Sequence, residues 1–171
     1  MSTSLFEDKT DLARIIIKPL YFGLLVNIVI PMGLLLVFFY INNNHYIENR
    51  MGDFANPLFY IFIVLALLEA AFALWWRGKL FKQPMIRRPE TFENDFSSEL
   101  LARSKPIFIL IASISVYGYV YLMLTGRFTE SVLFVVFSFV VFQVVRPRYG
   151  MTRKLIERQQ QLVKEGKFRN G

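Results

Sequence analysis

The chain has 171 residues, of which 54% are apolar and 16% are aromatic, and its mean hydropathy is +0.40. This composition excludes an ordinary soluble domain, because so much apolar surface must be buried in lipid or against partners. The lack of cysteine excludes disulfides and thiolate metal sites. The net charge of +7 does not indicate nucleic-acid binding, because the basic residues flank hydrophobic segments and are not interleaved with stacking aromatics.

Four stretches are apolar over roughly the 20 residues that a helix needs to cross the hydrocarbon core of a bilayer. We expect membrane spans at residues 19–41, 57–76, 106–125 and 128–145. Their continuous apolarity argues against barrel strands, in which lipid-facing and lumen-facing residues alternate. The sequence therefore predicts an all-α membrane protein, a four-transmembrane-helix bundle that forms a single integral membrane domain over residues 1–171.

The basic residues are distributed very unevenly around these spans. Of the 20 lysines and arginines, eighteen lie before the first span, in residues 77–105, or after residue 145, and only Arg50 and Arg127 lie in the other two loops. Positive charge near span ends is retained on the cytoplasmic side. We therefore expect both termini, the loop 77–105 and the tail 146–171 to be cytoplasmic, in the inner membrane of a bacterium.

Similar short motifs open the first and third spans. Leu12-Ala13-Arg14 and Lys18-Pro19 precede the first, and Leu101-Ala102-Arg103 and Lys105-Pro106 precede the third. A duplication would give two tandem helical hairpins in the same orientation. The alternative is that proline at a helix start and basic residues at the cytoplasmic boundary are general preferences.

The segments outside the spans also have helical signals. Pro84 and Pro89 prevent one continuous helix through the loop, and Ser97 or Ser98 is a candidate cap for a short helix that leads into the third span. After the fourth span, Thr152 is a candidate cap for a basic amphipathic helix that ends near Gly166. Such a helix can lie on anionic lipid, dock on a partner, or remain solvated.

Glu69 is the most informative side chain, because it lies roughly 10 Å inside the second span. A carboxylate there is costly, so it must be protonated, paired or in contact with water. Counting helical rise places Asn27, Ser113 and Ser138 at a similar depth, roughly 10 to 14 Å. We therefore predict an intramembrane polar site of Glu69, Asn27, Ser113 and Ser138. Ala66, Ala70 and Ala73 share the Glu69 face and predict close helix packing there.

This site allows two readings. Glu69 can bind a proton, a cation or a cationic substrate, as acids do in transporters. Alternatively, a protonated Glu69 bonds to Asn27 or a serine and holds helices together. The second reading is favoured, because one acid without an intramembrane base or a second acid makes a poor proton relay.

Other candidate sites are weaker. Lys79, Lys82, Arg87 and Arg88 form a group that can contact anionic lipid headgroups. His45 is the single histidine and has no neighbouring ligands, so no metal site is predicted. No catalytic arrangement or phosphate-binding motif is present, so we predict no cofactor and no enzymatic activity.

These observations predict a non-catalytic accessory or structural subunit of a larger membrane protein complex. The predicted partners are membrane lipids and either other membrane subunits or further copies of the chain, and not nucleic acid. The main alternative is a small oligomeric proton- or cation-coupled transporter or channel that uses Glu69. The third class is a membrane enzyme that acts on lipid. Such an enzyme needs a nucleophile and a base near the interface, and the sequence shows neither.

Overall fold

The computed structural model describes residues 9–44 and 49–169, with side chains from Ile15 onward. His45, at which no metal site is predicted, lies outside the described residues. The described chain is helical apart from short connections. Four of its helices are long and apolar enough to cross a membrane, which is the structure expected of a multi-pass membrane protein.

The first span is one rod made of α1 (Lys9–Leu24), the π-helical turn η1 (Leu25–Val29) and α2 (Ile30–Asn44). The second is α3 (Ala55–Leu80), which follows the short 3₁₀ turn η2 (Gly52–Phe54). The third is α4 (Phe92–Thr125), which follows η3 (Pro89–Thr91), and the fourth is α5 (Phe128–Val145). The last helix, α6 (Tyr149–Lys164), is short and polar.

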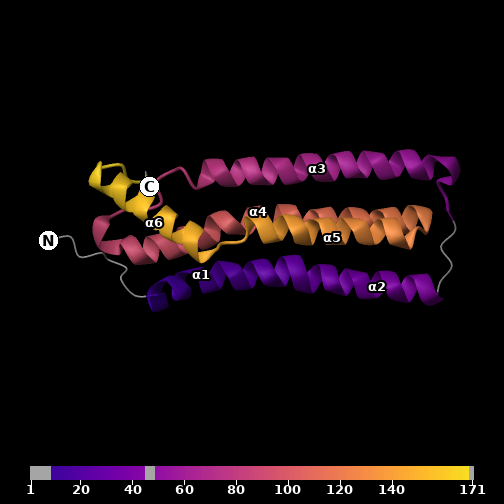
Figure 1. Ribbon diagram of the computed structural model, residues 1–171, viewed down its shortest axis with the longest axis horizontal. Coiled ribbons are helices and arrows are strands. Elements are labelled where there is room, and N and C mark those ends of the chain that lie inside the picture. The colour runs from indigo at the N-terminus through magenta and orange to yellow at the C-terminus, as the bar shows by residue number, and fades with distance from the viewer. Residues whose placement is uncertain (1–8, 45–48, 170–171) are drawn as a thin grey trace.

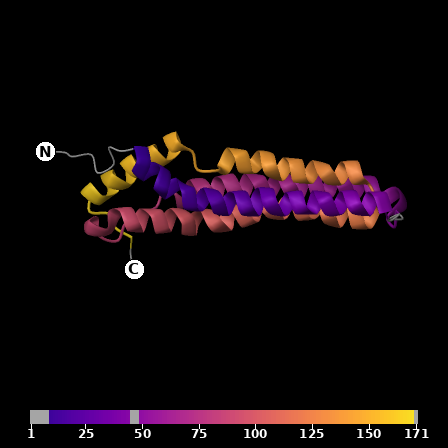
Figure 2. The same cartoon turned by 90° about the horizontal axis from the view of Figure 1, so that it is seen from below.

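The four long helices form three layers. In Figure 1, α4 and α5 lie in the middle, α3 lies along one side of them, and the α1–α2 rod lies along the other. Figure 2, seen from the α1–α2 side, shows the α1–α2 rod in front, with α5 above it and α4 below it. Half of the residues in the most apolar window of the third span are buried (50%), against 17% in the first and second spans. The α4–α5 pair is therefore the centre of the bundle.

Two glycines explain the tight α4–α5 pairing. A Cβ at Gly118 would lie 2.4 Å from the Ser131 carbonyl oxygen, so only glycine allows the two backbones to approach this closely. Gly126 ends α4 with a φ of 67°, and its N–H donates to the Leu122 carbonyl over 2.8 Å. The left-handed residue lets the chain reverse directly into α5.

A second, smaller core lies beyond one end of the four-helix bundle. We call this region the cap: the loop 81–91, the start of α4 as far as Ser104, and α6. Its buried apolar residues come from the loop, α4, α6 and the start of the first rod. They are Ile15, Met85, Ile86, Phe92, Phe96, Leu100 and Ile156. Ile156 of α6 is buried in this core, and Leu155 and Val163 of the same helix pack against it.

The predicted helices are present, but several boundaries differ. The fourth helix coincides with residues 128–145, whereas the third begins at Phe92 and runs through Pro106 without interruption. Ser97 and Ser98 therefore lie inside α4 and do not cap a helix, and Thr152 lies inside α6, which begins at Tyr149. Hydropathy marks only the apolar part of each helix, while the backbone hydrogen bonds continue into polar sequence that packs in the cap.

The two halves of the chain are packed differently. The third and fourth spans lie side by side as a hairpin, whereas the first and second spans lie on opposite faces of that hairpin. The expectation of two alike tandem hairpins therefore does not describe this arrangement. Among the described residues, the close backbone contact of Gly118 with Ser131 belongs to the third and fourth spans.

Candidate functional site

Glu69 lies on the face of α3 that packs against α4. Ala66, Ala70 and Ala73 are buried in the same interface, as their spacing predicts. These small side chains let α3 approach α4 closely, so a carboxyl on this face reaches the neighbouring helix. The Glu69 residue as a whole is half-buried.

The carboxyl of Glu69 contacts the hydroxyl of Ser113 on α4 through Oε1. The same Ser113 hydroxyl also lies 2.6 Å from the Leu110 carbonyl oxygen, one turn earlier in α4. A serine hydroxyl has one proton and cannot donate to both acceptors. The Ser113 hydroxyl therefore lies between the Glu69 carboxyl and the Leu110 carbonyl and links α3 to α4.

The second carboxyl oxygen of Glu69, Oε2, is buried and has no hydrogen-bond partner among the described residues. Tyr117, one turn after Ser113 on α4, is close enough to interact electrostatically with the carboxyl. Its ring stacks on Phe62 of α3, with the ring centroids 5.8 Å apart. The sequence analysis did not single out Tyr117, although its spacing of four residues from Ser113 places both on one face of α4.

Asn27 and Ser138 have other partners. Asn27 is fully buried in η1, where its Nδ2 donates to the Gly23 carbonyl over 3.2 Å, within its own rod. Its Oδ1 has no partner among the described residues. Ser138 of α5 donates to the Ile111 carbonyl of α4 over 2.8 Å. The structure thus brings Glu69 and Ser113 together and gives Asn27 and Ser138 separate contacts.

The π-helical turn explains how Asn27 comes to be buried at this place. The N–H of Ile30 donates to the Leu25 carbonyl, five residues back instead of four. Pro31 follows at once, and a proline inside a helix lacks an N–H and crowds the carbonyl four residues earlier, which is that of Asn27. A widened turn is a usual response to this conflict.

The four basic residues predicted to contact lipid headgroups are all exposed. Lys79, Lys82, Arg87 and Arg88 lie at the end of the bundle that carries the cap. The Lys79 ammonium lies over the Trp75 ring, 5.3 Å from its centroid. By contrast, Arg50 and Arg127 lie at the opposite end, where the Arg50 N–H donates to Leu124 and Arg127 contacts Asn56.

Arg103 is the main polar residue that the sequence analysis did not single out. Its guanidinium donates to the carbonyl oxygens of Leu80 and Gln83 and, over 2.7 Å, to that of Pro84. These carbonyls belong to the end of α3 and the loop after it, where a helix leaves carbonyls without intrahelical partners. Arg103 also forms a 3.0 Å ion pair with Glu99, which in turn contacts Arg169.

Gln159 of α6 holds the same loop from the other side. It is fully buried, its Oε1 accepts from the Met85 N–H over 2.9 Å, and its Nε2 donates to Gln83 over 3.2 Å. The Arg169 N–H donates to the Ile86 carbonyl over 2.8 Å. The loop is therefore held by backbone and side-chain bonds to distant parts of the chain, which sequence spacing does not reveal.

No family model, curated protein or solved structure matches this chain. In the part of the chain that the structure describes, no group of three or more His, Cys, Asp or Glu side chains is placed to hold a metal ion.

Proposed function

We propose that this chain is a non-catalytic accessory or structural subunit of a larger membrane protein complex. The observation that carries the proposal is the pairing of Glu69 with Ser113 across the α3–α4 interface. Ser138 likewise joins α5 to the α4 backbone. Polar side chains inside membrane bundles commonly hold helices together, and these two do so here.

The outer faces of the bundle suit lipid and subunit contacts. Large apolar side chains on the first two spans face outward, for example Leu36 at 69% exposure, Tyr60 at 66% and Leu68 at 62%. The grouping of basic residues at the cap end supports an orientation with that end in the cytoplasm. We extend the proposal to a bacterial inner membrane with both termini on the cytoplasmic side.

Purification in a mild detergent tests this function. The tagged full-length chain, expressed at native level, is expected to recover defined membrane partners in a complex of fixed size. The matched control is the same chain solubilised in a harsh detergent, which removes the partners and leaves the bundle. A single chain without a stable partner in the mild detergent contradicts the proposal.

A second candidate function is a small oligomeric transporter or channel coupled to a proton or cation. The observation that favours it is the buried Oε2 of Glu69, which has no partner among the described residues and leaves an acceptor open to a cation or a proton. Proteoliposomes containing the wild-type chain or Glu69→Gln distinguish the two functions. Flux that depends on Glu69 supports transport, and the lack of flux in the wild type rejects it.

A further inference from the structure

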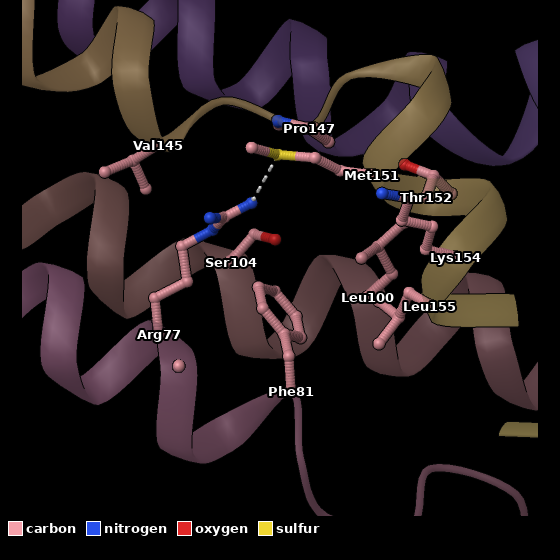
Figure 3. A pocket seen from close by; sticks show the side chains of 11 residues that line it. Arg77, Phe81, Leu100, Ser104, Val145, Pro147, Met151, Thr152, Lys154 and Leu155 are labelled. Atoms are coloured by element: carbon pink, nitrogen blue, oxygen red, sulfur yellow. Dashed lines mark hydrogen bonds between the residues drawn. The ribbon is translucent and has the colours of Figure 1, made fainter. Parts of the chain in front are cut away.

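A pocket of about 280 Å³ lies where the cap meets the four-helix bundle. Its walls come from the end of α3, the start of α4, the connection from α5 to α6, and the first turns of α6. Figure 3 shows the Arg77 side chain extending from α3 into this space, with Phe81 and Leu100 on one side and Met151 on the other. The lining is mainly apolar, with a few polar groups.

The charge in this pocket is positive and unbalanced. The Arg77 guanidinium donates to the Met151 sulfur at 3.5 Å, and a thioether is a weak acceptor. The charged neighbour that acts on it is Arg148, which has the same sign, and Lys154 also lines the pocket. Among residues 15–44 and 49–169, no carboxylate lies within ion-pair distance of Arg77. A half-buried guanidinium with several unused donors is suited to an anion.

Ser104 supplies a second, independent indication of a ligand. The residue is only 3% exposed, and Figure 3 shows its hydroxyl directed into the pocket beside Arg77. No hydrogen bond of this hydroxyl is found within the described residues. Most buried polar groups in proteins are hydrogen-bonded, so an unpartnered hydroxyl that faces a cavity points to a group that binds there.

The pocket lies at the level where the apolar helices end. Arg77 directly follows Trp75 and Trp76, aromatic residues of the type that favours the membrane interface, and Val145 is the last residue of α5. At this level a bilayer presents phosphate groups next to the start of its acyl chains. The apolar walls formed by Phe81 and Val145 suit the start of an acyl chain. Arg77 and Ser104 suit the phosphate group.

We propose that this pocket binds one anionic phospholipid, with the lipid phosphate accepting hydrogen bonds from Arg77 and Ser104 and the Lys154 ammonium near the headgroup. The site differs from the exposed group of Lys79, Lys82, Arg87 and Arg88, because it is a shaped cavity between four elements. The inference rests on membrane insertion of the bundle and not on the presence of a protein partner.

Native mass spectrometry of the full-length chain tests the site. The chain is released from nanodiscs that contain equal amounts of phosphatidylglycerol and phosphatidylcholine, and the retained lipids are counted. We expect one phosphatidylglycerol to be retained in preference to phosphatidylcholine. Arg77→Gln is expected to reduce that preference about tenfold, because it removes charge-assisted hydrogen bonds. Ser104→Ala is expected to reduce it by a smaller factor.

The control is Lys79→Gln, which removes a charge from the exposed surface of the same helix. Its effect must be smaller than that of Arg77→Gln. Equal effects of the two variants, or unchanged retention in both Arg77→Gln and Ser104→Ala, overturn the proposal. Saturation of the site by inorganic phosphate alone, with no preference for lipid, also overturns it.

Thermal unfolding in lipid-free neutral detergent identifies a variant that fails to fold. If Arg77→Gln fails to fold, Ser104→Ala decides the outcome. The assay uses the isolated chain, so failure to find a partner complex does not affect it.

Discussion

The Ser113 hydroxyl of α4 contacts the Glu69 carboxyl of α3, and it also lies 2.6 Å from the Leu110 carbonyl oxygen. The contact satisfies one oxygen of a carboxyl group that lipid would not tolerate. It also joins an outer helix of the bundle to the central pair.

Ser113→Ala is expected to lower the free energy of unfolding by about 1 kcal/mol, because it leaves the carboxyl of Glu69 without this partner. Glu69→Gln is expected to cost less, since the carbonyl oxygen of a glutamine amide can still accept from the Ser113 hydroxyl. The measurement is reversible unfolding in mixed micelles. Ser98→Ala, on the exposed side of the same helix, is the control, and an equal loss in both serine variants would contradict a structural role for the pair.

Gly118→Ala is expected to destabilise the protein by about 1–3 kcal/mol, because the added methyl group overlaps the Ser131 carbonyl oxygen and forces α4 and α5 apart. The matched control is Gly33→Ala, where a Cβ meets nothing within 4 Å. That change is expected to leave stability unchanged or to raise it by up to about 1 kcal/mol through helix propensity. Thermal unfolding of both variants in the same detergent makes the comparison, and similar melting temperatures would refute the close contact.

Arg103→Lys is expected to release the loop after α3, since an ammonium group cannot reach three carbonyls as the guanidinium fork does. The local loss is about 1.5–3 kcal/mol, the usual range for hydrogen bonds to a charged group. Hydrogen exchange of residues 81–88 measures it. Arg88→Lys, at an exposed position, is the control, and equal protection in the two variants would argue against this role of Arg103.

Gln159→Ala is expected to open the contact between α6 and the loop, because the Met85 N–H becomes a buried donor without a partner. Such a group costs about 1–3 kcal/mol. Limited proteolysis is expected to cut the loop 81–91 faster in this variant than in Gln161→Ala, which changes an exposed residue of the same helix. If both variants are cut at the wild-type rate, Gln159 does not hold the loop.

Asp95 lies in the charged first turns of α4, before Pro106 and outside the apolar stretch. Its carboxylate accepts hydrogen bonds from the Arg87 N–H, over 2.8 Å, and from the Thr91 hydroxyl. These two donors hold the pKa of Asp95 below its ordinary value of 3.8. A lowered folded-state pKa contributes stability above the unfolded value, and that stability is lost as the pH falls through the folded value. Hydrogen exchange of residues 87–91 is therefore expected to rise below pH 3.8 in the wild type. In Asp95→Asn the exchange should be independent of pH in that range after correction for intrinsic rates, and a parallel rise would remove Asp95 as the cause.

The sequence was sufficient to predict the four long helices, because apolar length is a direct requirement of the bilayer. It also predicted the small-residue face around Glu69 and placed Ser113 at the same depth. Depth, however, does not specify which helix faces which. Counting helical rise therefore places Asn27 and Ser138 at the depth of Glu69. In the structure, Asn27 bonds within its own rod and Ser138 bonds to the α4 backbone.

The cap could not be predicted in the same way. Met85 and Ile86 are fully buried, yet they lie between prolines in a loop that reads as polar. Their burial depends on α6, and Gln159 reaches the Met85 N–H across 74 residues of sequence. The π-helical turn at Leu25–Val29 was also missed, because proline predicts a local distortion without specifying its form.

The three-layer order has a consequence for how the protein is made. Membrane proteins are synthesised from the amino terminus, so the first rod and α3 emerge before either of the helices on which they pack. Until α4 has been made, the inward face of α3, including Glu69, lacks its native neighbour Ser113, and the contacts of the α1–α2 rod are complete only when α5 follows. The fold is therefore assembled only at the end of translation, and any factor that shields the inward faces of the first rod and α3 must act before α5 is made.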